Sequence, residues 1–162
     1  MKMKILVASD THRRISPLVK TVANENFDAL FFLGDNVEDG EEIAKRLNIA
    51  EKYIVRGNGD FYANYPDKLI VEMLGHRMIL VHGHKENVKL DLRQLMALAE
   101  KEGAESAFFG HTHIASIDRL EDILFLNPGS PTFPRGGDYK KTFAVLDVTN
   151  EHIWADIRNI SK

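Results

Sequence analysis

The sequence contains no cysteine, which excludes a disulfide scaffold, a thiol nucleophile and any metal site built on thiolates. Long hydrophobic runs are also absent, because no uninterrupted apolar run exceeds five residues and a membrane span needs about 20. The first acidic residue, Asp10, follows only four consecutive apolar residues, unlike the pattern of a signal peptide. We therefore expect a cytoplasmic protein with no membrane partner.

Neither sign of charge dominates the chain. Lys and Arg number 21 and Asp and Glu number 24, for a net charge of −3. This balance argues against an extended nucleic-acid footprint held by charge alone. With 162 residues, 44% of them hydrophobic, and no internal repeat or linker, the chain is expected to form a single domain over 1–162.

The hydrophobic pattern predicts an α/β protein. Short apolar strands over 4–8, 29–33 and 53–55 alternate with helices that begin at Ser16 and over 41–47. Such alternation is typical of a mainly parallel sheet. Later in the chain we expect a hairpin over 69–73 and 78–81, closed by a turn at 74–76.

A longer helix that ends at Gly103 is predicted next. Its apolar face is formed by Val88, Leu92, Leu95, Met96 and Ala99. Closely spaced strands are then expected over 106–109, 116–120, 123–126, 142–148 and 153–157. These are more strands than one sheet comfortably holds. Two packed sheets with helices outside fit the pattern better.

Polar clusters of similar chemistry follow six of the predicted strands. They are Ser9–His12, Gly34–Asn36, Arg56–Asp60, His82–His84, Gly110–His113 and Asn127–Ser130. Ligands of open α/β sheets bind beyond the carboxyl ends of strands. If these strands share a direction, the clusters meet at one edge. Each cluster alone is typical of an ordinary turn, but six together favour a functional site.

Five of the seven histidines lie in these clusters: His12, His82, His84, His111 and His113. Imidazole, carboxylate and amide groups without sulfur suit divalent ions such as Mn²⁺, Fe²⁺, Ni²⁺ or Zn²⁺. Residues two apart on an extended segment point to the same side, so Asp10 and His12 can reach one metal or two close together. The remaining histidines, His76 and His152, are interpreted as structural or solvent-facing.

The ordered set of these motifs, from Asp10-x-His12 to Asn127-Pro128-Gly129-Ser130, resembles the calcineurin-like metallophosphoesterase superfamily, and more narrowly its small bacterial and archaeal phosphodiesterases. The resemblance implies a four-layer αββα sandwich of two mixed β-sheets flanked by helices. It also implies two divalent ions, with Mn²⁺ expected first and Ni²⁺, Fe²⁺, Zn²⁺ or Mg²⁺ as alternatives. One ion would be bound by Asp10, His12 and His113, the other by Asn58, His82 and His111, with Asp35 bridging them.

The chemistry implied is hydrolysis of a small phosphodiester by a hydroxide that bridges the two metals. Asn58, a neutral ligand, would also contact the substrate phosphate. Many larger members of the superfamily carry a proton-donating histidine after the Gly-Asn pair, where this chain has Gly59. His84 is the fallback donor. Arg13, where relatives often carry glycine, is a candidate contact for phosphate.

Two other classes of function stay open on the sequence. One is a non-catalytic protein-binding module on the same fold, like the retromer subunit, although such a module is expected to have lost ligand histidines. The other is a small nuclease or a cyclic-nucleotide phosphodiesterase. Assembly into a homo-oligomer is also open, since nothing in the sequence decides it.

Overall fold

The computed structural model describes residues 1–161. In this part of the chain there are ten strands, three α-helices and one short 3-10 helix. In chain order they are β1 Lys2–Ala8, α1 Ser16–Thr21, β2 Ala29–Phe32, α2 Val37–Arg46, β3 Glu51–Ile54, η1 Asn58–Asp60, β4 Lys68–Met73, β5 His76–Val81, α3 Arg93–Glu102, β6 Ser106–Phe108, β7 Ser116–Leu120, β8 Ile123–Asn127, β9 Thr142–Thr149 and β10 Ile153–Asn159.

The strands form two mixed sheets of five. The first has the order β10-β9-β1-β2-β3 and the second the order β4-β5-β6-β8-β7. Within each sheet, the three strands that precede the predicted polar clusters run parallel to one another. They are β1, β2 and β3 in the first sheet, and β5, β6 and β8 in the second. The hairpins β9–β10, β4–β5 and β7–β8 supply the antiparallel strands.

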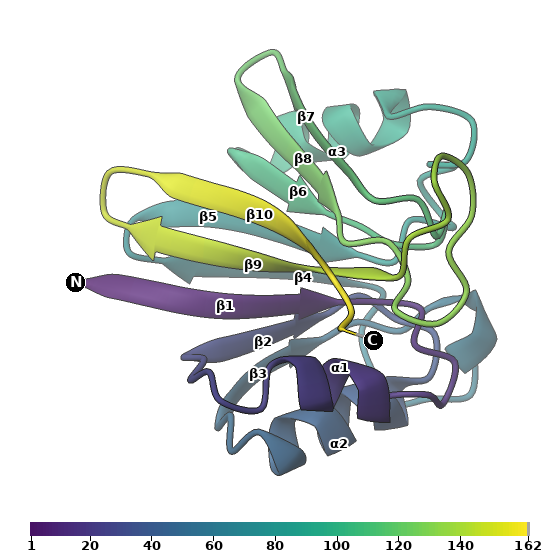
Figure 1. Ribbon diagram of the computed structural model, residues 1–162. Coiled ribbons are helices and arrows are strands. Elements are labelled where there is room, and N and C mark those ends of the chain that lie inside the picture. The colour runs from purple at the N-terminus through teal and green to yellow at the C-terminus, as the bar shows by residue number, and fades with distance from the viewer. Residues whose placement is uncertain (162) are drawn as a thin grey trace.

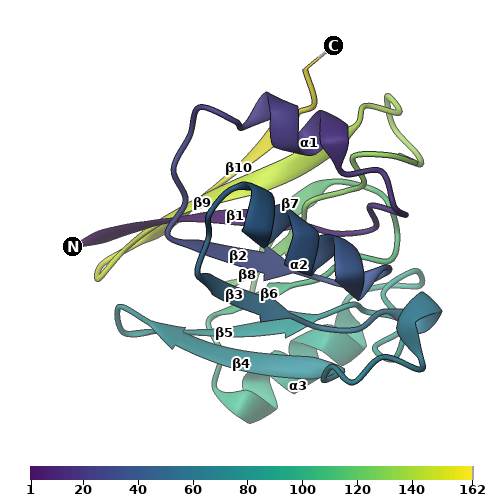
Figure 2. The same ribbon diagram turned by 90° about the horizontal axis from the view of Figure 1, so that it is seen from below.

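The sheets stack face to face with helices outside, which confirms the predicted αββα sandwich. Helices α1 and α2 lie over the outer face of the first sheet, and α3 lies over that of the second (Figures 1 and 2). Strand β1 shows how the alternating side chains divide between layers. Ile5 and Val7 point into the core between the sheets, whereas Leu6 and Ala8 pack beneath the helices.

One predicted helix begins later than its apolar spacing indicates. The spacing predicted a helical face from Val88 onward, but α3 begins at Arg93 and residues 85–90 form turns. Val88 is nevertheless buried against the α3 core. Its backbone N–H donates to the carbonyl of Gly83 at 3.2 Å, so Val88 reaches that core from a turn. Val88 is therefore buried although it is not helical, which explains why its spacing predicted an earlier start for the helix.

Smaller differences occur at two other boundaries. Helix α2 begins at Val37, four residues before the predicted start, and His76 opens β5 instead of closing the hairpin turn. No helix among residues 1–161 is long and apolar enough to cross a membrane.

Candidate metal centre

The loops that follow the parallel strands of both sheets gather at one end of the molecule, on the right in Figure 1. Because parallel strands of one sheet end at the same edge, all six predicted clusters follow strands that finish there. Asp10 and His12 come after β1, Asp35 after β2 and Asn58 after β3. The second sheet contributes His82 and His84 after β5 and His111 and His113 after β6.

Asp10 occupies the centre of this cluster and is fully buried. Its Oδ2 accepts hydrogen bonds from the Ser9 hydroxyl at 2.7 Å and from the His111 backbone N–H at 2.9 Å. Its Oδ1 is also buried but accepts no hydrogen bond. This oxygen lies 3.3 Å from His113 Nε2 and 3.8 Å from His82 Nε2. A buried carboxylate oxygen without a donor is costly, so the position favours a cation.

Two histidine rings are oriented by backbone carbonyls. Nδ1 of His82 donates to the Leu33 carbonyl at 2.6 Å, and Nδ1 of His113 donates to the Phe133 carbonyl at 2.6 Å. These bonds leave Nε2 of each ring facing the cluster, where a neutral ring offers its lone pair to a metal. The same arrangement orients metal-binding histidines in general.

Electron-pair donors therefore face one another on both sides of Asp10. On one side, His12 Nε2 lies 3.4 Å from His113 Nε2. On the other, His82 Nε2 lies 3.1 Å from Asn58 Oδ1 and 3.6 Å from Asp35 Oδ2. Such groups repel one another unless a cation lies between them. The residues present thus fit divalent ions bound by nitrogen and oxygen donors.

The ligand atoms form two groups of three, each within 4.8 Å: Asp10, His12 and His113, and Asp10, Asp35 and His82. Asp10 is common to both groups. The resemblance instead implies Asp35 as the bridging ligand, and that role stays a prediction.

The other predicted site residues lie around these groups. The His111 ring is centred 5.0 Å from the His82 ring, and the His84 ring lies 5.5 Å from His82 and 6.1 Å from His111. Nδ1 of His84 is buried and has no hydrogen-bond partner among the described residues. Arg13 is exposed, and its backbone N–H donates to Asp39 at 2.7 Å. Its contact with a substrate therefore stays a prediction.

Burial and charge act in opposite directions on the titrating groups. Burial disfavours the charged form of Asp10, but His113, His82 and Ser9 lower the pKa of this carboxyl below its ordinary value. Burial likewise opposes protonation of His113, yet Asp10 raises the pKa of that ring. Burial, together with the charge of His82, lowers the pKa of His111 to about 4. A cluster with such opposed shifts is typical of functional sites.

Asp60 has a role that the sequence did not reveal. It is buried, and its carboxylate accepts hydrogen bonds from four backbone N–H groups, those of Asp35 at 2.8 Å, Asn36 at 2.9 Å, Val37 at 3.2 Å and Gly57 at 2.9 Å. The β2 loop and the start of α2 are thereby attached to the β3 loop. Gly57 has no side chain and cannot complete a capping box with Asp60, so no motif in the sequence points to this role.

Gly59 completes this connection between the two loops. Its N–H donates to Asp35 Oδ1 at 2.9 Å, and a Cβ atom at this position would lie only 3.2 Å from the same oxygen. At Gly57 the approach is closer still, because a Cβ there would lie 2.2 Å from Asp35 Oδ1. Asp35 is therefore oriented by the backbone at Gly57 and Gly59, which approaches so closely that a side chain at either glycine would crowd the Asp35 carboxylate.

Five of the seven predicted ligands have backbone conformations in the left-handed region. They are Asp10 at φ 57°, His12 at 46°, Asp35 at 60°, His111 at 72° and His113 at 60°. For residues other than glycine this region costs about 1–2 kcal/mol each. Strain of this kind accumulates at functional sites because the surrounding structure enforces it.

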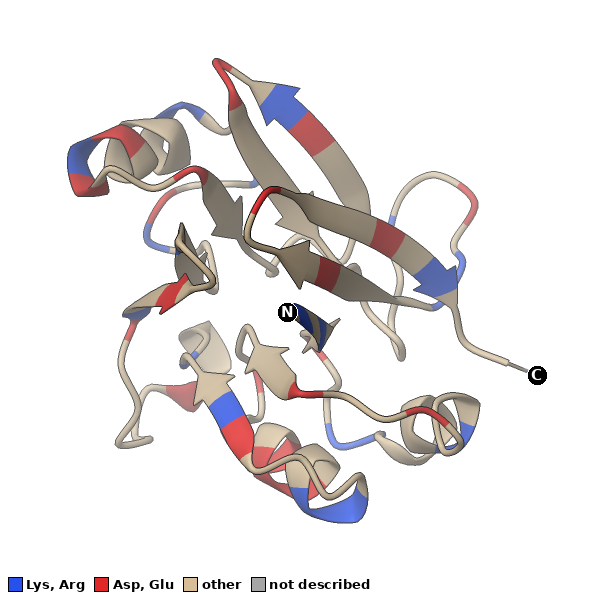
Figure 3. Cartoon of the chain, turned by 90° about the vertical axis from the view of Figure 1, so that its left-hand side faces the viewer, with Lys and Arg blue, Asp and Glu red and all other residues tan. Residues whose placement is uncertain are grey.

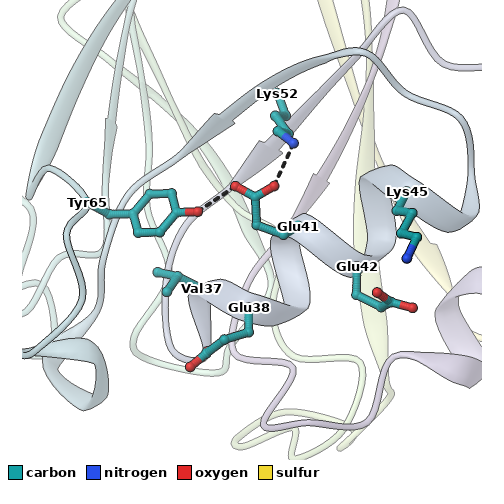
Figure 4. A pocket seen from close by; sticks show the side chains of 7 residues that line it. All are labelled: Val37, Glu38, Glu41, Glu42, Lys45, Lys52 and Tyr65. Carbon is teal, nitrogen blue, oxygen red and sulfur yellow. Dashed lines mark hydrogen bonds and ion pairs between the residues drawn. The ribbon is translucent and has the colours of Figure 1, made fainter.

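A separate groove beside α2 lies outside this cluster. Figure 4 shows the seven residues that line it: Val37, Glu38, Glu41, Glu42, Lys45, Lys52 and Tyr65. Glu41 accepts hydrogen bonds from the Tyr65 hydroxyl and from Lys52, both at 2.5 Å. The bond to Glu41 raises the pKa of Tyr65 to about 12. Glu41 is thus satisfied by its neighbours, and the lining contains no histidine for a metal.

The chain belongs to the calcineurin-like phosphoesterase superfamily, whose domain model matches residues 3–151. Among curated relatives, the probable metallophosphoesterase YsnB of Bacillus subtilis is 31% identical over 153 residues, covering 92% of this chain and 86% of that protein. The phosphodiesterase YfcE of Escherichia coli K12 is 28% identical over 171 residues, covering 90% and 88% respectively.

Solved structures agree with the family assignment. A Streptococcus pneumoniae protein described as a predicted phosphoesterase superimposes with a TM-score of 0.83 at 29% identity, covering 98% of this chain and 90% of that one. Vps29 of Entamoeba histolytica, solved with Zn²⁺, has a TM-score of 0.80 at 18% identity, with coverages of 98% and 100%. At that identity Vps29 shares the fold, and its role does not transfer.

Proposed function

We propose that this protein is a metal-dependent phosphodiesterase that hydrolyses a small phosphodiester at a dinuclear centre. The observation that carries the proposal is the buried, donor-free Oδ1 of Asp10 between His82 and His113. Following the family pattern, one ion is bound by Asp10, His12 and His113. The other would be held by Asn58, His82 and His111, with Asp35 available to both.

Two divalent ions, when bound, lower the pKa of water and neutralise charge that develops on a phosphate. The residues of the chain bind these ions and position the substrate. Asn58 is a ligand without charge, so it does not repel an anionic phosphate. Arg13, on the exposed loop after β1, supplies a cation for a phosphate oxygen. Following the family resemblance, Mn²⁺ is the first expectation for the metal, and a donor set of nitrogen and oxygen only is compatible with it.

Gly59 cannot protonate the leaving group, and His84 is the fallback donor, proposed to supply only part of that assistance. Its ring is adjacent to His82 and His111. General-acid assistance contributes about 10²–10⁴-fold. Its contribution is measured by comparing His84→Ala with the unchanged protein on an alkyl ester and on a p-nitrophenyl ester. Loss confined to the alkyl ester supports this role, and equal loss on both esters contradicts it.

The principal experiment measures hydrolysis of bis-p-nitrophenyl phosphate and p-nitrophenyl phosphate with Mn²⁺, Ni²⁺, Mg²⁺ or EDTA. Asp35→Ala and His113→Ala should abolish most activity, whereas His152→Ala, which changes a histidine remote from the site, should not. Faster turnover of the diester supports a phosphodiesterase. Activity that survives EDTA or both ligand substitutions would overturn the dinuclear proposal.

The alternative is a protein-binding module without turnover. The shared fold with Vps29 supports it. Because a Vps29 structure was itself solved with Zn²⁺, metal binding alone does not separate the two functions, and turnover must be measured. Retention of His12, His82, His111 and His113 favours the enzyme. A short oligonucleotide and a cyclic nucleotide, tested in the same assay, separate the nuclease and cyclic-nucleotide alternatives.

A further inference from the structure

A loop after β8 carries an aromatic ring to the edge of the metal centre. Phe133 is 45% exposed, and its ring is centred 5.6 Å from the ring of His12. Its carbonyl accepts the hydrogen bond from His113 Nδ1. Phe133 therefore orients the predicted ligand His113 through its backbone and contacts the predicted ligand His12 through its side chain.

Hydrogen bonds attach this loop to the loop after β1. The Ser130 hydroxyl donates to the Asp10 carbonyl at 2.8 Å and accepts the Phe133 N–H at 2.8 Å. The Thr132 hydroxyl donates to the Thr11 carbonyl at 2.8 Å. Ser130 and Thr132 are both buried. The ring of Phe133 is thus held in a defined position relative to the ligands of one metal.

Arg14 rests on this ring. Its guanidinium carbon lies 5.4 Å from the centre of the Phe133 ring, within the range of a cation–π contact. The backbone of Arg14 is anchored as well, since its N–H donates to the Thr11 carbonyl at 3.0 Å. A guanidinium that is already placed by an aromatic ring loses less entropy when it binds a ligand.

The charge of Arg14 has no counter-ion in the part of the chain described. No ion pair involves Arg13, Arg14 or Arg135 among residues 1–161, although other arginines, such as Arg56 and Arg158, are paired with carboxylates. The carboxylate attached to this loop, Asp39, already accepts the Thr11 hydroxyl at 2.6 Å and the Arg13 N–H at 2.7 Å. Arg135 is tethered to the same side, where its N–H donates to the His113 carbonyl at 2.9 Å.

Elsewhere on the surface the charges are interspersed. Figure 3 shows the end of the molecule opposite the site, where basic and acidic segments alternate. The protein as a whole is mildly acidic, with a net charge of −3.

We infer that Arg14, held by Phe133, binds a second phosphate group on the alcohol arm of the substrate. The inference rests on the proposed phosphodiesterase function and specifies its substrate as a phosphodiester that carries a further phosphate. A planar guanidinium with several N–H donors matches the geometry of phosphate oxygens. The second phosphate is either a terminal monoester or the next linkage of a short oligonucleotide, since both present the same oxygens.

The test uses three p-nitrophenyl esters of thymidine 5′-phosphate, with a 3′-hydroxyl, a 3′-phosphate or a 3′-methylphosphate. In the unchanged protein with Mn²⁺, kcat/KM should be at least about tenfold higher with a 3′-phosphate group than with the hydroxyl, as expected for a charge-assisted contact. The gain should lie in KM, because the contact persists from bound substrate to transition state. A gain retained by the methylphosphate identifies an oligonucleotide linkage, and a gain confined to the free phosphate identifies a terminal one.

Arg14→Ala should remove this preference, and Arg14→Lys should retain part of it. Phe133→Leu should weaken it, because the guanidinium loses its support. Arg119→Ala is the matched control: Arg119 is also exposed and has no ion-pair partner within residues 1–161, but it lies on β7 beside the far groove that contains His76, so the preference should persist. Bound Mn²⁺, measured by elemental analysis, should be the same in all variants.

Equal kcat/KM for all three esters in the unchanged protein would overturn the inference, as would an unaltered preference in Arg14→Ala. In both cases metal-dependent turnover would leave the proposed function intact. Absence of metal-dependent turnover on every ester would instead overturn the proposed function, and with it this inference.

Discussion

At the scale of the residue, the cluster depends on groups that contact no substrate. Asp60 accepts four backbone N–H groups and so determines how Asp35 and Asn58 are presented to the other ligands. Loss of such supporting partners typically weakens metal binding 10–100-fold. The proposed ligands alone therefore do not account for the site.

We predict that Asp60→Ala weakens the binding of Mn²⁺ by about 10–100-fold, as measured by isothermal titration calorimetry. The direct ligands remain, but the loops that carry Asp35 and Asn58 lose their common anchor. Asp147→Asn, which alters a carboxylate paired with Lys2 on β1, is the control and should bind Mn²⁺ unchanged. Unchanged affinity in Asp60→Ala would show that the two loops are held by other contacts.

The glycine after Asn58 leads to a second prediction. Gly59 has no side chain to protonate a leaving group, and such assistance is worth about 10²–10⁴-fold. Esters with good leaving groups, such as p-nitrophenolate, should therefore be hydrolysed far faster than alkyl esters. The measurement is a plot of log kcat/KM against the pKa of the leaving group, which should fall steeply. A flat plot would mean that another residue donates the proton fully.

At the scale of the element, one buried histidine connects the two sheets away from the site. His76 opens β5 in the second sheet. Its Nδ1 lies 2.8 Å from Glu105 Oε1, and its Nε2 lies 2.6 Å from the Thr149 carbonyl at the end of β9. This placement agrees with the structural interpretation of His76 from the sequence.

His76→Ala should lower the free energy of unfolding by about 1–3 kcal/mol, because a buried side chain and its hydrogen bonds to Glu105 and Thr149 are lost. His152→Ala, at an exposed position beside the same groove, should change it by less than about 0.5 kcal/mol. Urea denaturation of both variants provides the comparison. Similar values for the two variants would contradict the proposed connection between the sheets.

The connection after α1 leads to a pH-dependent prediction. Glu25 accepts hydrogen bonds from Lys4 on β1 at 2.6 Å and from Arg158 on β10 at 2.9 Å. The Lys4 bond, reinforced by Arg158, lowers the pKa of Glu25 below its ordinary value of 4.5. The stabilisation is therefore complete above that value and is lost as the pH falls through the lower pKa of the folded state.

Glu25→Gln should accordingly cost about 0.5–1 kcal/mol at pH 7, and the difference from the unchanged protein should shrink once the pH falls below about 4. Urea denaturation from pH 7 to pH 3 measures this difference. A difference that is constant with pH would indicate that packing, and not charge, is responsible.

The positions of the strands were predictable because their signals are local and strong. Buried apolar runs such as 29–33 were followed by polar residues, and parallel topology then brought those residues together. The start of α3 was not predictable, because Val88 satisfies the helical spacing while packing from a turn. Nor were the roles of Asp60 and Phe133, which depend on loops that meet only in three dimensions.

At the scale of the whole molecule, the two sheets contribute to one site. Asp10, His12, Asp35 and Asn58 follow strands of the first sheet, and His82, His111 and His113 follow strands of the second. An ion bound by both sets would bind the folded state and not the unfolded chain. Its binding free energy would therefore add to global stability.

We predict that removal of metal with EDTA lowers the melting temperature, and that excess Mn²⁺ restores it. At a free metal concentration 100 times Kd, the stabilisation is about 2.7 kcal/mol. Scanning calorimetry with and without EDTA measures the shift. The double variant Asp10→Asn and Asp35→Asn should show little or no shift, and an equal shift in that variant would place the ion elsewhere.

The left-handed backbone at Asp10, His12, Asp35, His111 and His113 has a consequence for how this protein changes under selection. At each position glycine is the residue that the backbone accepts most easily, and it is also the residue that supplies no ligand. Variants enriched for heat resistance without metal should accordingly accumulate glycine at these five positions and lose turnover. Retention of aspartate and histidine there across a diverse population would be a record of catalysis, since folding alone favours their replacement.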